Sequence, residues 1–206
     1  WTTTIDSTKL HFLEIHGKPP GFVELLPKLF EWRNQAKQHD VPLFVFTMMR
    51  DPLDWLLSCF NFFCLAIRKH TKCTSPASIS GLLQQARPDP QSRWFCFMNT
   101  IMAVPNQTEP DMSSCTLHYI LPLLIENMDW VGFLEKYDES LLVLQQVLPP
   151  NVTLRFQKRN KTRQTKIKRE MLNETTTFFL KNSMKQDYDL YNKLQQEYRL
   201  ENVLAE

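Results

Sequence analysis

The chain has 206 residues, of which 43% are hydrophobic and 22% are charged. This composition excludes a disordered or fibrous protein and is ordinary for one folded domain with a sizeable core. No run of about eighteen apolar residues occurs, so we expect no transmembrane helix, and the net charge of +2 does not by itself indicate a partner.

The first forty residues predict a strand followed by a helix. Residues 9–16 alternate polar and apolar side chains, as a half-buried strand does, and the glycines and prolines at 17–21 end it. From Phe22 to about Lys37 the apolar side chains recur at roughly helical spacing, which predicts a helix.

A second strand and helix are predicted over 42–68. Residues 42–49 are nearly all apolar, so we expect a strand covered on both faces. Asp51 is a good N-cap, and Pro52 falls at the first helical position, where its missing N–H costs nothing. The alternation of strands and helices favours an α/β fold with a parallel sheet and helices on its faces.

The later segments are mixed in character. Prolines punctuate residues 70–116, which we interpret as a loop-rich insertion over the carboxyl edge of the sheet, where α/β folds place ligands and where an acceptor would be recognised. We expect short helices at 79–86 and 94–102, a helix or strand at 117–124, a strand at 128–133, and helices at 137–148, 168–182 and 186–203.

The segment from Arg50 to Ser58 carries the main functional signal. An arginine at the end of a strand and a hydroxyl two turns into the next helix can converge on one anion near the helix N-terminus. With Asp51 and Pro52 directly after the arginine, this spacing resembles the element of sulfotransferases that binds the 3'-phosphate of 3'-phosphoadenosine 5'-phosphosulfate (PAPS). The alternative is structural: an arginine that ends a strand and a serine buried in a helix.

Two further stretches resemble Golgi carbohydrate sulfotransferases, especially the heparan sulfate 2-O-sulfotransferase group. Residues 130–144 look like a Val-Gly stretch that follows the acceptor region there, and residues 155–163 are similar to a basic loop that closes over the cofactor. The resemblance implies a three-layer P-loop-like sulfotransferase fold, with a central parallel sheet flanked by helices. It would form one partial domain over 1–206, in which 155–206 supply the basic loop and C-terminal helices.

The resemblance also implies which residues bind the cofactor. Arg50 and Ser58 would grip its 3'-phosphate. The candidates to contact the nucleotide or an anionic acceptor are the basic residues Lys158, Arg159, Lys161 and Arg163.

One element of the family is missing from the sequence. These sulfotransferases begin with a strand and a glycine loop carrying Lys and then Ser or Thr, which holds the 5'-phosphosulfate. None of the four glycines lies in such a pattern. We therefore expect either a fragment that begins after this strand and loop, as Trp1 in place of an initiator Met also indicates, or a degenerate pseudoenzyme.

Sulfuryl transfer needs a base for the acceptor hydroxyl, and His16 is the first candidate. A neutral imidazole titrates near the working pH, and the resemblance implies a catalytic histidine beside a glycine at this strand end. Glu14 shares the same face of the predicted strand and is either the alternative base or a partner that orients the imidazole. A loop histidine beside two prolines is the structural alternative. No metal is expected.

Cysteines and glycosylation patterns bear on the compartment. Asn-x-Thr patterns occur mildly more often than chance predicts and indicate the secretory pathway; they begin at Asn106, Asn151, Asn160 and Asn173. With the resemblance, they lead us to expect a Golgi lumenal glycoprotein with a membrane anchor upstream. We expect Cys59 to be a buried thiol. Three disulfide pairings are open for Cys64, Cys73, Cys96 and Cys115.

Three classes of function remain open. The first is a PAPS-dependent sulfotransferase acting on a hydroxyl of a glycan or similar polar acceptor. The second, less favoured, is a P-loop nucleotide kinase, which would need a Walker-type glycine loop and magnesium ligands. The third is a non-catalytic module that binds an anionic polymer through the positive charges at 155–169. These charges would also suit a nucleic acid backbone, but we assign no nucleic-acid partner.

Overall fold

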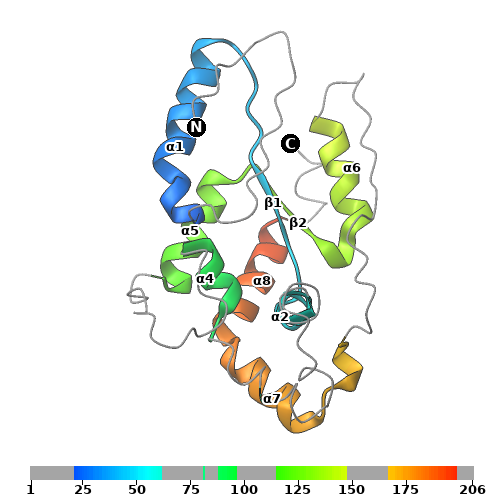
Figure 1. Cartoon of the computed structure of the whole chain (residues 1–206). Helices are drawn as coiled ribbons and strands as arrows, with labels where there is room; N and C mark the ends of the chain where they lie inside the picture. The colour runs from blue at the N-terminus through cyan, green and yellow to red at the C-terminus, as the bar shows by residue number, and fades with distance from the viewer. Residues whose placement is uncertain (1–20, 62–80, 82–87, 97–114, 148–166, 199–206) are drawn as a thin grey trace.

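The structure is a computed structural model that describes residues 21–61, 81, 88–96, 115–147 and 167–198. It is an α/β fold, mostly helical around a small parallel sheet (Figure 1), so the coarse fold prediction is confirmed. In the part of the chain that the structure describes, the sheet has two strands, β1 (Phe46–Met49) and β2 (Trp130–Phe133). Phe46 pairs with Trp130, and Met49 with Phe133.

Strand β1 is shorter and less covered than the sequence predicts. The ladder begins at Phe46 rather than at residue 42, because β2 begins at its partner Trp130. Leu43 is exposed, the first three residues of β1 are half-buried, and Met49 alone in β1 is buried. The prediction of a strand over 42–49 covered on both faces is therefore wrong. An apolar run does not reveal which of its residues have a neighbour.

Helices lie on both faces of β2. Val131 and Phe133 are buried in the same cluster as residues of α5 (Leu117–Asn127) and α8 (Lys185–Glu197). Trp130 points the other way, because side chains alternate along a strand, and it is buried against α6 (Tyr137–Val147). The two faces of the strand thus contribute to different parts of the core.

Gly132 allows α6 to approach the sheet closely. A methyl group at this position would lie 2.5 Å from Met48 Sδ and 3.0 Å from Ser140 Cβ. Ser140 is buried in α6, where its hydroxyl accepts the Phe133 N–H at 3.0 Å and lies 3.0 Å from the Lys136 carbonyl oxygen, to which it donates. The missing side chain of Gly132 therefore sets the spacing between strand and helix.

The helices mostly appear where the sequence predicts them, with changes at their ends. The ambiguous segment at 117–124 is helical, and the helix predicted from residue 94 begins four residues earlier. The helices not yet given are α1 (Phe22–Gln38), α2 (Pro52–Phe60) and α4 (Pro90–Cys96), and a 3-10 turn, η3 (Leu134–Lys136), joins β2 to α6. The predicted strand at 9–16 and the helix at 79–86, apart from Gly81, lie outside the described residues, as do the ends predicted at 62–68, 97–102 and 199–203.

The helix predicted at 168–182 is divided in two. Its first residues form a 3-10 turn, η4 (Arg169–Met171), and a new helix, α7 (Glu174–Ser183), follows. The break occurs because Asn173 is an N-cap: its side chain accepts the Thr176 N–H at 2.7 Å. A single continuous helix is therefore the wrong prediction for this segment.

Helix α2 packs against the segment that follows the basic region of the chain. Leu53, Leu56 and Phe60 are buried in one cluster with Ile167 and with residues of α7 and its C-cap. At the end of α2, the amide of Asn61 both donates to the Ile167 carbonyl and accepts the Ile167 N–H, each at 2.9 Å. These two hydrogen bonds therefore join the backbone of Ile167 to the C-terminal end of α2.

Candidate functional site

The carboxyl ends of β1 and β2 meet at one edge of the sheet. Because the strands are parallel, the residues after Met49 and after Phe133 emerge on the same side, the usual place for ligands in α/β folds. Helix α2 begins at this edge (Figure 1), and the N-terminus of a helix carries partial positive charge. The predicted pair Arg50 and Ser58 belongs to this loop and helix.

Asp51 starts α2 in the way the sequence predicts. Its Oδ1 accepts the backbone N–H of Leu53 at 3.0 Å and of Asp54 at 3.2 Å, and Pro52 occupies the first turn. Two of the N–H groups that a helix leaves unpaired at its start are therefore satisfied by one carboxylate oxygen.

Glu135 ties the end of β2 to this loop. One of its oxygens accepts the Asp51 N–H at 2.9 Å, and the other accepts the hydroxyl of Tyr191 at 2.8 Å. Burial, and then the hydrogen bond to Glu135, raise the pKa of Tyr191, so the phenol keeps the proton that it donates. The phenol oxygen in turn accepts from Gln195 at 2.9 Å. The backbone after Arg50 is thus held by η3, the turn that follows β2, and through it by helix α8.

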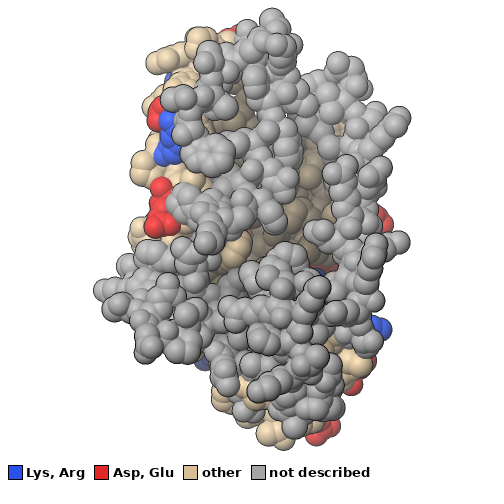
Figure 2. All heavy atoms as spheres, in the orientation of Figure 1, with Lys and Arg blue, Asp and Glu red and all other residues tan. Residues whose placement is uncertain are grey.

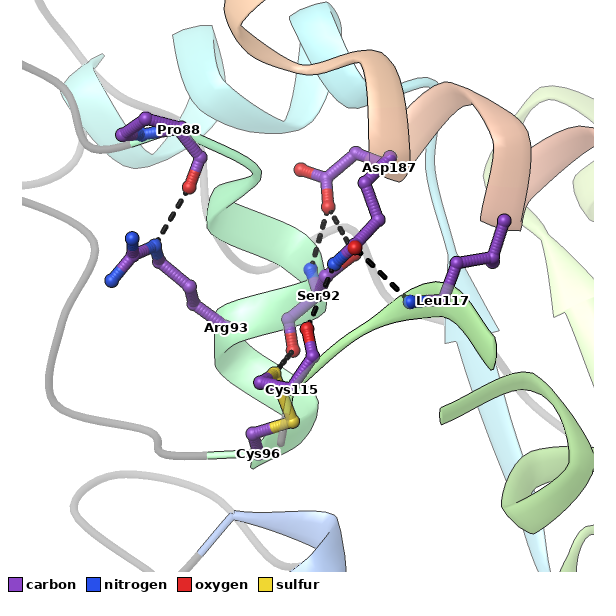
Figure 3. Close-up of a disulfide and its surroundings, with 8 residues drawn as sticks. Pro88, Ser92, Arg93, Cys96, Cys115, Leu117 and Asp187 are labelled. Carbon is purple, nitrogen blue, oxygen red and sulfur yellow. Dashed lines mark hydrogen bonds between the residues drawn. A yellow bond between two sulfur atoms is a disulfide. The ribbon is translucent and has the colours of Figure 1, made fainter. Parts of the chain in front are cut away.

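A buried carboxylate organises the helix next to the Arg50 loop. Asp187 of α8 is fully buried and accepts three hydrogen bonds: from the Gln91 N–H at 2.8 Å, and from the N–H and the hydroxyl of Ser92, both at 2.6 Å (Figure 3). These donors lie at the start of α4. The side-chain amide of Gln91 then donates to the Arg50 carbonyl at 2.8 Å, so the cap of α4 also positions the loop.

The arrangement is reciprocal. Asp89, directly before α4, accepts the N–H groups of Gln186 at 2.8 Å and of Asp187 at 3.2 Å, at the start of α8. Asp187, in α8, thus caps α4, and Asp89, directly before α4, caps α8. We call Asp89 and Asp187 the reciprocal caps. Burial raises the pKa of Asp187 to about 7 although its three donors oppose the rise, and burial also raises the pKa of Asp89.

A disulfide between Cys96 and Cys115 joins the end of α4 to the residues before α5. Gln186 fastens the same junction, because it donates to the Cys115 carbonyl and accepts the Leu117 N–H, both at 3.0 Å. Cys115 Sγ lies 3.3 Å from the Ser92 carbonyl oxygen (Figure 3), which is a contact and not a hydrogen bond, since a disulfide sulfur has no proton to donate. Of the four cysteines considered for pairing, the structure bonds Cys96 to Cys115, while Cys64 and Cys73 lie outside the described residues.

Arg50 is a half-buried residue that lies between β1 and α2 in the sequence. Among the residues that the structure describes, none forms an ion pair or a hydrogen bond with its guanidinium. Its charge acts on Cys59, a free thiol of α2 that is half-buried rather than buried as predicted: burial raises the pKa of Cys59 to about 12, and the positive charge of Arg50 opposes this rise. The positive charge of Arg50 therefore acts on Cys59, the residue of α2 that directly follows Ser58 in the sequence.

Ser58 lies on the exposed side of α2. Its side chain is solvent-accessible, and its hydroxyl makes no hydrogen bond within the described ranges. The structural alternative required a serine buried in the helix, so this part of the alternative is wrong. The same loop and helix thus carry a hydroxyl and a guanidinium that have no partner among the described residues.

The basic region of the sequence does not form a patch in the part that the structure describes. Arg169 forms an ion pair with Asp51 and lies 3.5 Å from Asp54, and Lys168 lies 3.6 Å from Glu170. On the face shown in Figure 2, the positive and negative side chains of described residues alternate over α1, as in the ion pair of Lys28 with Glu31. Arg169 therefore stabilises the start of α2, and its positive charge is already paired with Asp51.

The predicted catalytic residues and most of the predicted basic contacts lie outside the described residues. This applies to His16, Glu14, Lys158, Arg159, Lys161 and Arg163. They remain predictions. Of the six candidate cofactor-binding residues, the structure describes Arg50 and Ser58.

Sequence reasoning missed the residues that hold the loop in place. Glu135 was part of the stretch at 130–144 that resembles the sulfotransferases, two residues beyond a predicted strand, but no contact was predicted for it. Gln91 and Asp187 belong to segments whose proximity no local pattern indicates. The one usable signal was for Glu135, because the ends of two parallel strands should meet.

No family model, curated protein or solved structure matches this chain. Among the described residues, no cluster of three or more His, Cys, Asp or Glu side chains has the geometry to hold a metal ion. Within those same ranges, no helix has both the length and the apolar character needed to cross a membrane.

Proposed function

We propose that this chain is the 3'-phosphate-binding part of a PAPS-dependent sulfotransferase, which moves a sulfuryl group to a hydroxyl of a glycan or similar polar acceptor. The proposal includes the three-layer P-loop-like fold, completed by a strand and glycine loop that this sequence does not contain. It also includes the Golgi lumen as the compartment.

The observation that carries the proposal is the Arg50 guanidinium, which has no partner among the described residues at the carboxyl edge of a parallel sheet. A cation on a half-buried residue favours an anionic partner, since any loss of water contacts must be compensated. Here the nearby carboxylates have other partners: Asp51 and Asp54 with Arg169, and Glu135 with the Asp51 N–H and Tyr191. A phosphate monoester would be a suitable partner for Arg50, because guanidinium binds phosphate through paired charge-assisted hydrogen bonds.

The proposed reaction assigns a role to each group. Arg50 and Ser58 hold the 3'-phosphate of the nucleotide, and the basic residues at 158–163 contact the nucleotide or the acceptor. The acceptor oxygen attacks sulfur while the bond from sulfur to the 5'-phosphate oxygen breaks, and adenosine 3',5'-bisphosphate leaves. His16, or Glu14 in the alternative, takes the proton of the acceptor hydroxyl. Positioning and electrostatics would supply most of the rate.

The position of the carboxylates argues against a nucleotide kinase. Such an enzyme needs acidic side chains available to magnesium. Asp51 already accepts two backbone N–H groups and pairs with Arg169, and Asp54 lies beside the same guanidinium. These contacts suit a helix start rather than a metal site.

The test measures how the full-length protein containing this chain discriminates nucleotides. We expect adenosine 3',5'-bisphosphate to bind more tightly than adenosine 5'-monophosphate, and Arg50→Ala to reduce this preference by about tenfold to a hundredfold, as expected for a lost charge-assisted hydrogen bond. Ser58→Ala should reduce it less. Lys193→Ala, which removes an exposed charge from α8, is the matched control.

A preference for the 3'-phosphate that survives in Arg50→Ala would refute the proposed site. Wild-type protein that binds the bisphosphate but transfers no sulfuryl group from PAPS to glycan acceptors would instead indicate the non-catalytic module or pseudoenzyme. The two measurements therefore separate the binding site from the chemistry.

A further inference from the structure

The segment Asn173-Glu174-Thr175 has the acceptor pattern for N-linked glycosylation, and the proposed function makes no use of it. All three side chains are exposed, at the start of α7 near the end of the molecule drawn lowest in Figure 1. The other three patterns of this kind begin at residues outside the described ranges. Asn173 is therefore the acceptor whose surroundings can be examined.

The oxygen and the nitrogen of the Asn173 side-chain amide have different surroundings. Its oxygen accepts the Thr176 N–H at 2.7 Å and caps α7. Because only the oxygen can accept a backbone N–H, this contact fixes the orientation of the amide. The nitrogen makes no hydrogen bond within the described ranges. The atom to which a glycan is attached thus belongs to an exposed side chain and is not needed for the cap.

Modification at the nitrogen would leave the cap intact. In the transfer, the amide nitrogen bonds to the first sugar carbon of a lipid-pyrophosphate-linked oligosaccharide, the lipid pyrophosphate leaves, and the amide loses one proton. The product keeps its carbonyl oxygen, which can still accept the Thr176 N–H. The backbone of Asn173 is extended, with φ −74° and ψ 163°, so the side chain projects before the first helical turn and not along the packed face.

The disulfide gives independent support for the compartment in which this transfer occurs. Disulfides persist in oxidising compartments such as the lumen of the endoplasmic reticulum and are rare in the cytosol. The bond between Cys96 and Cys115 is far along the chain from Asn173 and does not depend on the glycosylation pattern. From the acceptor geometry and the disulfide together, we propose that Asn173 carries an N-linked glycan. This inference is independent of the proposed sulfotransferase activity.

The test uses the full-length protein expressed in a eukaryotic cell from its complete natural reading frame. The purified protein is treated with a peptide N-glycosidase in water enriched in heavy oxygen, which converts a glycosylated asparagine to a labelled aspartate. Trypsin then releases residues 170–181, a peptide that contains Asn173 and none of the other patterns. We expect this peptide to be recovered mainly as labelled aspartate.

Two variants separate the glycan from the cap. Asn173→Asp preserves a good N-cap and removes the acceptor, and Thr175→Ala preserves Asn173 but breaks the pattern. Each should increase gel mobility by the step of one glycan, whereas Thr175→Ser should keep the glycan. Recovery of residues 170–181 with unmodified asparagine from the wild-type protein would overturn the inference, whether or not the other patterns carry glycans.

Discussion

Removal of the buried Asp187 carboxylate should destabilise the fold more than removal of an exposed carboxylate from the same helix. In Asp187→Ala, the N–H groups of Gln91 and Ser92 lose their acceptor at a fully buried position. An unsatisfied buried donor costs about 1–3 kcal/mol, so the two N–H groups together cost about 2–6 kcal/mol. Water that enters the vacated space would satisfy part of this demand, and we expect a loss of about 2–4 kcal/mol in the free energy of unfolding.

The conservative variant Asp187→Asn should lose less. Its amide oxygen can still accept from Ser92, but its NH2 group faces the Gln91 N–H, so about one hydrogen bond is lost, at about 1–2 kcal/mol. Asp189→Ala is the matched control, since Asp189 is exposed on the same helix, and it should change stability by less than about 0.5 kcal/mol.

Urea denaturation followed by tryptophan fluorescence measures these differences. The variants should shift the midpoint and leave the slope m unchanged, because the folded and unfolded states expose similar surface. The reasoning fails if Asp187→Ala is as stable as Asp189→Ala, or if Asp187→Asn is the less stable of the two Asp187 variants.

Three further outcomes are expected. Because the pKa of Asp187 is about 7 in the folded chain and its ordinary value is 3.8, its stabilising contribution should be full below about pH 4 and fall as the pH rises to about 7, so urea midpoints should decline over this window, and more steeply in the wild type than in Asp187→Asn, which keeps Asp89 with its own raised pKa. Gly132→Ala should lose about 1–3 kcal/mol by pushing Met48 and Ser140 apart, and an unchanged melting temperature would contradict this. Replacing Cys96 and Cys115 by serine should cost about 3 kcal/mol of stability. A double-serine variant with the same urea midpoint as the oxidised wild type would contradict this.

The parts of the fold that the sequence predicts are those with local signals. Asp51 and Pro52 mark the start of α2 within two residues, and the apolar spacing after residue 21 marks α1, so both helices begin where expected. Ser58 and Arg50 could be assigned to one loop and helix for the same reason. Local chemistry is sufficient when the partner lies within a turn or two of helix.

The parts that could not be predicted depend on contacts between distant segments. Glu135 meets the Asp51 N–H across 84 residues, and Asp187 meets Ser92 across 95. Arg169 looks like one member of a basic cluster, and only the fold shows that it lies against Asp51. Burial along 42–49 likewise depends on which strand lies alongside, and the sequence of the segment itself does not contain this information.

The reciprocal caps impose an order on how the chain can mature during synthesis. Residues of α4 leave the ribosome well before Asp187, which lies 95 residues beyond Ser92, and domains form as their residues become available. Until Asp187 emerges, the first N–H groups of α4 have no acceptor there, and a helix this short is marginal by itself. Helix α4, and the Arg50 loop that Gln91 holds, must therefore stay incompletely structured until α8 has been synthesised.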